Sequence, residues 1–403
     1  MPNSAPKTSK GIKSLRVLNI CHESAVGGAQ VSVTRACAAL KMISAPVRFE
    51  IAARGKGFLS ASAIEQGCMY FEQPCLSLLP HLEESRGRNL LKAMSYPSQV
   101  MLLALWLQRL NPSIVHIHSA LLQAPAHAAA SLKIPVVWTV HEMLEKDSPH
   151  LAPMCGPRRL ANTIAKISSK IIVTAEAAAK AFLILAPGTD VTIVRVGFDM
   201  EPFKDLKKKR SAARKRLNIP LDEKVVLFPG YLARKKGFPV LVKALESFKG
   251  KDDTGHPVPL LLARGRGDVE AAGNLAGMAG IRADISGPTS HPGDMADLYA
   301  AADLVVVPSL SETQSLVAIE AMAAKIPVAA SRVGDLDLYL DPVQLSVPGD
   351  HVTLARSIEM MLYNRELAEA LVQKAAKKVQ KMNSPRAYGS ALLSIYTSIS
   401  RAG

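Results

Sequence analysis

Short runs of β-branched and other apolar residues alternate with amphipathic, often alanine-rich stretches along most of the chain. This alternation constrains the fold more than any other feature. The apolar runs lie at 14–21, 114–119, 135–141, 170–175, 191–196, 224–230, 259–265, 283–287, 303–309 and 326–331. Near-continuous Val, Ile and Leu segments separated by helices are typical of parallel sheets covered on both faces. The sequence therefore predicts an α/β protein.

The length of the chain predicts more than one domain. At 403 residues it exceeds the size at which a single hydrophobic core usually keeps growing. We expect a first domain over 13–199, a second over 200–385, and a C-terminal helix over 386–403 that packs back on the first domain. Parallel sheets bind ligands at the carboxyl ends of their strands. We therefore expect two Rossmann-like parallel-sheet domains facing a central cleft.

The charge balance favours an anionic partner. The formal net charge is +15, which suits nucleic acid, an anionic membrane surface or a phosphorylated substrate. Aromatic residues make up only 5% of the chain and do not interleave with basic ones, so nucleic acid is not expected. The segment 204–216 carries eight Lys or Arg against one Asp. It fits either a solvated helix face or contact with an anionic membrane.

The cysteines and the apolar segments indicate the cellular location of the protein. The five cysteines are odd in number and contain no C-x-x-C pair, which disfavours a disulfide framework or a zinc site. Each is expected to be a small buried hydrophobe. No signal peptide is visible, and the apolar run 100–107 is too short to span a bilayer. We expect a cytoplasmic protein, with docking at the inner face of the cell membrane left open.

Two glutamates near the end of the second half call for an explanation. The stretch PSLSETQSLVAIEAMA (308–323) follows an apolar run and turns helical from Leu316. It places Glu312 in the turn and Glu320 inside an otherwise apolar helix. Burying a carboxylate is costly unless hydrogen bonds compensate it. We therefore expect both glutamates to have polar partners.

Three other strand ends carry candidate ligand-binding residues. Gly27 and Gly28 in VGGAQ open a helix, and fit either close approach to a phosphate or a plain tight turn. Lys235 and Lys236 precede Gly237, where a phosphate site and a solvated turn are both open readings. The segment LLARGRGD (261–268) has two arginines with the same ambiguity.

Histidines mark two strand ends in the first half. His141 ends one strand and is followed by Glu142, so it is either a structural group or a polar group that handles protons. We treat His116 and His118 as structural and expect them on opposite faces of their sheet. No His, Cys, Asp or Glu grouping has metal-ligand spacing, so no metal is expected.

Taken in order, these strand ends resemble glycosyltransferase family 4, whose members are retaining, nucleotide-sugar-dependent enzymes of the GT-B fold. The resemblance covers about residues 14 to 400. The matching segments are VGGAQ (26–30), TVHE (139–142), VRVGFDMEPF (194–203), GYLARKKG (230–237) and ETQSLVAIEAMA (312–323). The most specific element is Glu312, seven residues and Glu320, followed by Ala-Met-Ala and then by Pro-Val at the next strand.

The resemblance implies roles for individual residues. Glu320 would accept hydrogen bonds from the ribose hydroxyls, and Glu312 would lie near the transferred sugar. The residues that would bind the donor are Gly27, Gly28, Gly230, Arg234, Arg266, Thr313, Gln314, Ser315, Leu316 and Glu320. Those that would act in catalysis are His141, Lys236 and Glu312. The nucleotide-sugar is then a co-substrate, and neither a cofactor nor a metal is needed.

Departures from the family pattern keep other functions open. Tyr231 stands where the family usually has Arg, and Arg234 is the candidate replacement. A catalytically weak nucleotide-sugar-binding module is therefore one alternative. A nucleotide-sugar epimerase of the same fold is another. The expected activity is transfer of a sugar from a UDP- or GDP-sugar to a hydroxyl acceptor, such as a lipid-linked saccharide or a polysaccharide precursor. The acceptor is expected on the first domain near 81–94, where Arg86, Arg88 and Lys92 supply positive charge.

Overall fold

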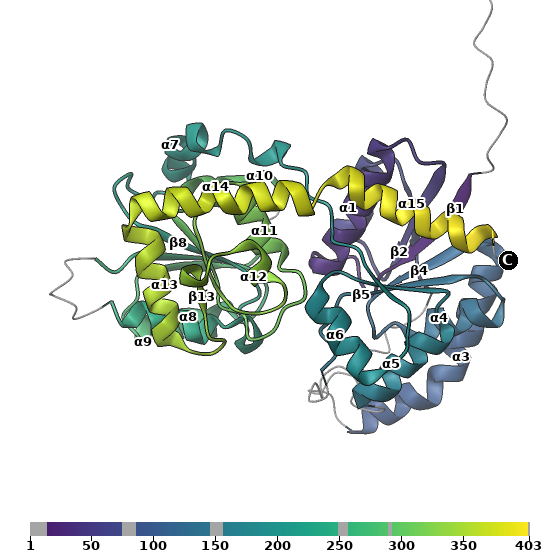
Figure 1. Cartoon of the computed structure of the whole chain (residues 1–403). Coiled ribbons are helices and arrows are strands. Elements are labelled where there is room, and N and C mark those ends of the chain that lie inside the picture. Colours follow the sequence, from purple (N-terminus) through teal and green to yellow (C-terminus); the bar gives the residue numbers. More distant parts are fainter. Residues whose placement is uncertain (1–13, 75–85, 146–155, 249–256, 289–291, 402–403) are drawn as a thin grey trace, which may run out of the picture. The chain divides into compact units, whose positions relative to one another are not determined.

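The computed structural model describes residues 14–74, 86–145, 156–248, 257–288 and 292–401 (Figure 1). The chain divides into two compact units. Unit 1 comprises the chain up to 174, residues 179–197 and residues 385 onward, and unit 2 comprises 175–178 and 198–384. Each unit contains a parallel sheet with helices, so the α/β class predicted from the sequence is confirmed.

Unit 1 is built on a seven-stranded sheet in the order β3-β2-β1-β4-β5-β6-β7, in which every pairing is parallel. Its strands are β1 Leu15–Ile20, β2 Val47–Ala53, β3 Met69–Glu72, β4 Ile114–His118, β5 Val136–Val140, β6 Lys170–Val173 and β7 Val191–Ile193. Five of the seven were expected from apolar runs, whereas β2 and β3 were not. The central strands β4 and β5 are buried along their whole length.

The helices of unit 1 include one from the end of the chain. They are α1 Gly28–Met42, α2 Phe58–Glu65, α3 Arg86–Leu110, α4 Gln123–Ser131, α5 Gly156–Ile167, α6 Glu176–Leu185 and α15 Pro385–Arg401. The first three residues of α6 are grouped with unit 2. Helix α15 runs alongside α1, as Figure 1 shows. A Cβ at Gly389 would lie 2.5 Å from the carbonyl oxygen of Ala39, so the two backbones approach too closely for a larger residue there. None of the described helices is both long and apolar enough to cross a bilayer.

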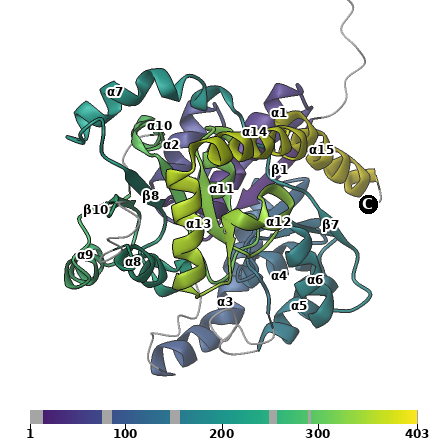
Figure 2. The same ribbon diagram turned by 60° about the vertical axis from the view of Figure 1, so that its left-hand side comes forward.

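Unit 2 contains a six-stranded parallel sheet in the order β10-β9-β8-β11-β12-β13. Its strands are β8 Val225–Pro229, β9 Leu260–Arg264, β10 Ala283–Ser286, β11 Leu304–Val307, β12 Val328–Ser331 and β13 Leu345–Ser346. Its helices are α7 Leu206–Arg216, α8 Phe238–Glu246, α9 Val269–Met278, α10 Pro292–Ala301, α11 Leu316–Ala323, α12 Leu336–Tyr339, α13 His351–Tyr363 and α14 Arg365–Met382, several of which are labelled in Figure 2.

The basic run 204–216 forms helix α7, and much of its charge is used inside unit 2. Arg214 is fully buried and donates to Asp303 at 2.7 Å and to four backbone carbonyls. Arg210 donates to the other oxygen of Asp303 at 2.6 Å, and Arg216 pairs with Asp297. The three arginines of the run therefore attach α7 to other parts of unit 2, whereas its lysines are exposed.

Two of the cysteines lie in contact. Cys37 on α1 and Cys68 just before β3 have their sulfur atoms 3.0 Å apart. Cys37 is buried and Cys68 is half-buried, while Cys21 is fully buried as expected for a small hydrophobe. Cys75 and Cys155 lie outside the described residues.

Candidate functional site

Unit 2 has a topological switch point between β8 and β11. From β8 the chain adds β9 and β10 on one side, and from β11 it adds β12 and β13 on the other. In open parallel sheets, ligands bind at the carboxyl ends of the strands where the order reverses. The loop after β8 carries Lys236, and the turn after β11 carries Glu312. These two residues, the ones predicted as catalytic in the second half, therefore lie in the loops that follow two adjacent strands.

A glycine holds these two segments together. Gly237 ends a 3-10 turn over Arg234–Lys236 in the left-handed conformation, with φ +74°. A Cβ on Gly237 would lie 1.8 Å from the carbonyl oxygen of Pro308, at the end of β11. The amide of Leu310 also donates to the carbonyl of Lys235 at 2.9 Å. The β8 loop is thus fixed against the end of β11, and only glycine fits at the contact.

We expect Gly237→Ala to lower the free energy of unfolding by more than about 1–2 kcal/mol, the cost of the left-handed backbone alone for an L-residue. The clash with Pro308 adds to this cost. Urea unfolding followed by far-UV circular dichroism measures the change. Gly273→Ala is the control, because Gly273 lies inside α9 with nothing within 4 Å of its added Cβ. It should raise the free energy of unfolding by about 0.5–1 kcal/mol, and a loss of equal size in both variants would contradict the argument.

Lys236 and Glu312 form an ion pair. The Lys236 Nζ lies 2.6 Å from Glu312 Oε1, and the Ser309 hydroxyl donates to the same oxygen at 2.8 Å. The Lys236 side chain is 35% exposed and that of Glu312 only 13%, so the carboxylate is the more sequestered partner. An ammonium and a carboxylate thus stand side by side at the switch point.

Glu320 projects from helix α11. It is half-buried rather than enclosed, and its Oε2 accepts a hydrogen bond of 2.8 Å from the hydroxyl of Tyr299. Tyr299 is itself buried on α10. The polar partner expected for Glu320 therefore exists within the protein, and it comes from a residue that the sequence did not single out.

The segment that carries Glu312 leads directly into the first backbone amides of α11. The helix begins at Leu316 after Ser315, whose side chain makes no capping hydrogen bond. The first amides of a helix have no partner within the helix and favour anions. Gln314 and Ser315 are buried, and Thr313 is half-buried. Four of the residues predicted to bind the donor thus form one continuous turn from Thr313 to Leu316.

The remaining candidates in unit 2 lie at the ends of β8 and β9. A Cβ at Gly265 would lie 1.8 Å from the carbonyl oxygen of Gly230, so these two loops touch. The amide of Leu232 donates to the carbonyl of Arg266 at 2.6 Å, which attaches Arg266 to the same contact. Arg234 and Tyr231 are exposed.

Arg264 has a different place from Arg266. Its guanidinium donates to Asp284 on the neighbouring strand β10 at 2.7 Å and to the carbonyl of the same residue at 2.8 Å. It therefore links β9 to β10, which resolves for this arginine the ambiguity that the sequence left.

Unit 1 has its own switch point, between β1 and β4. The loop after β1 leads to Gly27, which precedes α1 in an extended conformation. A Cβ added to Gly28 would meet nothing within 4 Å, whereas one on Gly27 would meet the side chain of Gln30. Gln30 is buried and donates to the carbonyl of Glu23 at 3.2 Å. It therefore braces the loop that carries the two glycines.

Three histidines form a row across β4 and the end of β5. The rings of His116 and His118 have their centroids 4.0 Å apart, and His118 Nδ1 lies 3.3 Å from His141 Nε2. The prediction that His116 and His118 face opposite sides of the sheet is wrong. Side chains point to opposite faces at successive strand positions, so residues two apart share a face. Burial lowers the pKa of His116 to about 3 and that of His141 to about 4.

Glu142, which follows His141, connects the ends of β4 and β5. Its carboxylate accepts hydrogen bonds from the hydroxyl of Ser119 and, at 2.9 Å, from the amide of Ala120. It also opposes the effect of burial on the pKa of His141. The loop after β4 and His141 are thus held in a fixed relation.

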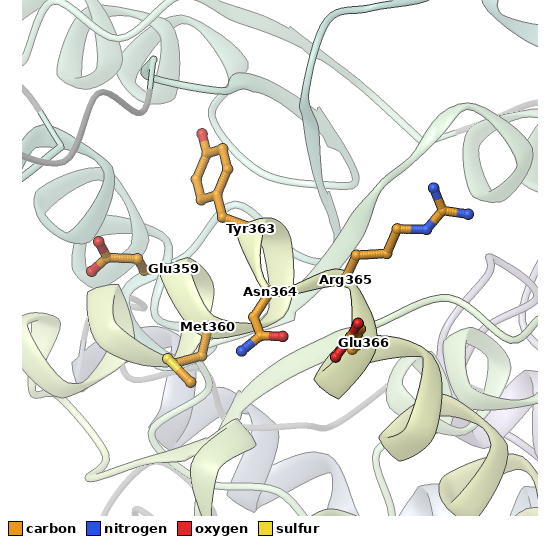
Figure 3. Close-up of a pocket in the computed structure, with 6 residues that line it drawn as sticks. All are labelled: Glu359, Met360, Tyr363, Asn364, Arg365 and Glu366. Carbon is orange, nitrogen blue, oxygen red and sulfur yellow. The ribbon is translucent and has the colours of Figure 1, made fainter.

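A surface hollow elsewhere in unit 2 contains none of the predicted site residues. Figure 3 shows its lining at the junction of α13 and α14, namely Glu359, Met360, Tyr363, Asn364, Arg365 and Glu366. Arg365 pairs along its own helix with Glu369 at 3.0 Å, and Asn364 caps α14. These polar groups serve the helix junction, so the hollow is not the candidate site.

No group of three or more His, Cys, Asp or Glu that could hold a metal occurs among the residues that the structure describes. That no metal takes part stays a prediction from the sequence. The side chains of Arg86, Arg88 and Lys92, predicted to face the acceptor, lie outside the described part of the chain.

Comparison with known proteins matches both halves of the chain to one class of enzyme. The family described as "Glycosyltransferase Family 4" matches residues 26–202, and "Glycosyl transferases group 1" matches residues 209–378. The D-inositol 3-phosphate glycosyltransferase of Mycobacterium tuberculosis is 34% identical over 214 residues. That alignment spans 50% of this chain and 43% of the relative, so the chain covers less than half the length of this curated protein.

Solved structures share the fold. HepE from Anabaena, in complex with UDP and glucose, is 19% identical with a TM-score of 0.77, over 95% of this chain and 100% of that one. Sucrose-phosphate synthase from Thermosynechococcus elongatus is 21% identical with a TM-score of 0.75, over 96% and 100%. The fold and the two switch points thus define a GT-B protein. The chain belongs to the family 4 glycosyltransferases, as its sequence motifs indicated.

Proposed function

We propose that the protein is a retaining glycosyltransferase that moves a hexose or related sugar from a UDP- or GDP-sugar to a hydroxyl acceptor. The observation that carries this proposal is the turn after β11. It holds Glu312 2.6 Å from Lys236 at a switch point and leads into the first amides of α11, and Glu320 follows about one helical turn later on the same helix. A nucleotide-sugar contains both hydroxyls and phosphates. Carboxylates accept hydrogen bonds from hydroxyls, and backbone amides together with an ammonium group bind phosphates.

Within this proposal each group has a distinct task. Glu320, with one oxygen held by Tyr299, orients the ribose. The amides of α11 and Lys236 stabilise the charge that develops on the leaving diphosphate. Such electrostatic stabilisation of the transition state is usually the largest single contribution to catalysis. Glu312 holds the hydroxyls of the transferred sugar. In unit 1, Gly28 leaves room beside its backbone for a ligand, and His141 contacts the sugar or the reacting phosphate. The departing phosphate accepts the proton of the acceptor hydroxyl, so that attack occurs on the face it leaves and configuration is retained.

The names of related proteins favour one donor class. HepE has been solved with UDP and glucose, and the mycobacterial relative is named for transfer to an inositol phosphate. We propose UDP-glucose or a similar UDP-sugar as the first donor to try. The acceptor would be a phosphorylated or lipid-linked hydroxyl compound, or a polysaccharide precursor, handled in the cytoplasm.

We also propose contact with an anionic membrane, made by fewer basic residues than the sequence suggested. Arg210, Arg214 and Arg216 are committed to carboxylates inside unit 2, so the cationic surface of α7 rests mainly on its exposed lysines, Lys207, Lys209 and Lys215. Co-sedimentation with phosphatidylserine vesicles at low salt tests this contact. Sedimentation that is equal with neutral vesicles would remove it.

A second function, a catalytically weak module that binds the nucleotide-sugar, is favoured by one observation. Tyr231 stands where the family usually has Arg, and its side chain is 51% exposed at the end of β8. One phosphate-binding cation is therefore replaced by a neutral group. Sugar transfer with a measurable turnover would exclude this alternative, and release of a free sugar without an acceptor would favour an epimerase instead.

A thermal-shift screen against UDP, GDP, ADP and their sugar conjugates tests the proposal. A ligand that binds only the folded protein stabilises it by about 2.7 kcal/mol at one hundred times its dissociation constant. We expect a UDP compound to raise the melting temperature of the wild type and to have little effect on Glu320→Ala. The control is Glu366→Ala, an exposed glutamate of the hollow in Figure 3, which should keep the full shift. If the shift in melting temperature were lost in Glu366→Ala but kept in Glu320→Ala, the donor would bind at that hollow and not at the candidate site.

A further inference from the structure

An asparagine in the core of unit 1 has an orientation that its neighbours determine. Asn19 on β1 is fully buried, and its amide nitrogen lies 3.3 Å from the carbonyl oxygen of Val17 and 3.2 Å from that of Glu50. Backbone carbonyls only accept hydrogen bonds, so the atom that faces both of them is the amide NH₂. The Asn19 side-chain oxygen must then point the other way.

That oxygen faces a histidine. Asn19 Oδ1 lies 3.1 Å from Nε2 of His118, which is also buried. An amide oxygen can only accept, so Nε2 of His118 carries the proton. Burial first, and then His116 and His141, lower the pKa of His118 well below its usual value, so the ring is neutral. A neutral imidazole has one N–H, which leaves Nδ1 of His118 as an acceptor.

The next contact passes this constraint to His141. Nδ1 of His118 lies 3.3 Å from Nε2 of His141, and the two ring planes are within 21° of each other. Because His118 accepts here, Nε2 of His141 must donate. Burial lowers the pKa of His141 to about 4, with His22 acting in the same direction and Glu142 against it. His141 is therefore neutral too, and its remaining nitrogen, Nδ1, is an acceptor.

We infer that Asn19, acting through His118, is a positioning residue that holds His141 in the Nε2–H tautomer. Two backbone carbonyls fix the amide, the amide fixes His118, and His118 fixes His141, all within unit 1. Neither Asn19 nor His118 touches a reacting atom in this scheme.

The tautomer selects what His141 can bind. A neutral ring with a lone pair on Nδ1 accepts a hydrogen bond from a hydroxyl but cannot donate one from that nitrogen to a phosphate oxygen. This consequence rests on the proposed function, and it narrows the role of His141 to a contact with a sugar hydroxyl. The tautomer itself does not depend on sugar transfer.

The experiment is a long-range ¹H–¹⁵N spectrum of the whole protein labelled with ¹⁵N in its histidine rings, ten in all. Protonated and unprotonated ring nitrogens resonate far apart, so the spectrum reports each tautomer directly. His141→Gln and His118→Gln assign the two rings by the signals that disappear. At neutral pH we expect both rings as Nε2–H. An Nδ1–H or doubly protonated His141 in the wild type would overturn the inference without any variant having to fold.

Variants then test the chain of contacts. Asn19→Leu removes the acceptor, so His141 should lose its single tautomer. His118→Gln should retain it, because an amide can also donate to Asn19 and accept from His141, whereas His118→Phe should not. Thr139→Val is the control: Thr139 contacts Nε2 of His116, at 2.7 Å, in the same row. An unchanged His141 signal in Asn19→Leu, or an equal change in Thr139→Val, would show that Asn19 does not set the tautomer. If no nucleotide stabilises the protein but the spectrum is as expected, only the function fails.

Discussion

Replacing Arg214 with leucine should lower the free energy of unfolding by about 3–5 kcal/mol, the usual cost of removing one partner from a buried ion pair. Arg214 has no exposed surface, and its guanidinium satisfies Asp303 and the carbonyls of Ala301, Pro220, Leu221 and Glu223. Leucine fills part of the space but leaves these oxygens without their donor. Arg210 still pairs with Asp303, which keeps the loss within this range.

The same helix supplies a matched control for this experiment. Arg216→Leu removes the ion pair with Asp297. Because the Arg216 side chain is 55% exposed, this change should lower the free energy of unfolding by less than about 1 kcal/mol. Both arginines lie in unit 2, whereas the two tryptophans of the chain, Trp106 and Trp138, lie in unit 1. Tryptophan fluorescence during urea unfolding therefore reports on unit 1 alone. Far-UV circular dichroism reports both units. Equal losses in the two variants would mean that burial of Arg214 contributes nothing.

The apolar runs predicted the buried central strands and also the edge strands β7 and β10. They missed β2, β3 and the two-residue strand β13, and for β2 and β3 the reason is physical. Strand β2 contains Arg48 and Glu50, so its sequence does not look like a core strand. In the structure Glu50 is fully buried and pairs with Arg48 at 2.7 Å and with Arg16 on β1 at 3.0 Å. A pairing between neighbouring strands cannot be read from either strand alone. Strand β3 is a half-exposed edge of four residues and has no periodic pattern to detect.

The candidate site shows the same division. The sequence located Glu312, Glu320 and Lys236 because the family motif and the strand ends mark them. It could not show that Lys236 pairs with Glu312, because 76 residues separate them in the chain. Tyr299 and Asn19 went unnoticed, since a tyrosine in a helix and an asparagine in a strand have no signal of their own. Only the fold shows that Tyr299 contacts Glu320 and that Asn19 contacts His118.

The second large effect that we expect is on turnover. Lys236→Met should lower kcat for release of UDP from the donor, with water as acceptor, by about 10²–10³-fold, the usual cost of losing one group that stabilises developing charge. The change in KM should be smaller, because the leaving diphosphate gains charge only as the bond breaks. The variant also leaves Glu312, 13% exposed, with Ser309 but without its cation.

Because the lysine and the carboxylate are in contact, their removals should not be additive. The double variant Lys236→Met, Glu312→Gln should therefore lose less than the product of the two single losses. Lys235→Met is the control, since it removes the same charge from the adjacent, exposed position of the same turn. Its kcat should stay close to that of the wild type, because the ion pair with Glu312 is made by Lys236. If the two lysine variants lose equal activity, general attraction of an anionic donor explains the effect, and the specific role of Lys236 is wrong.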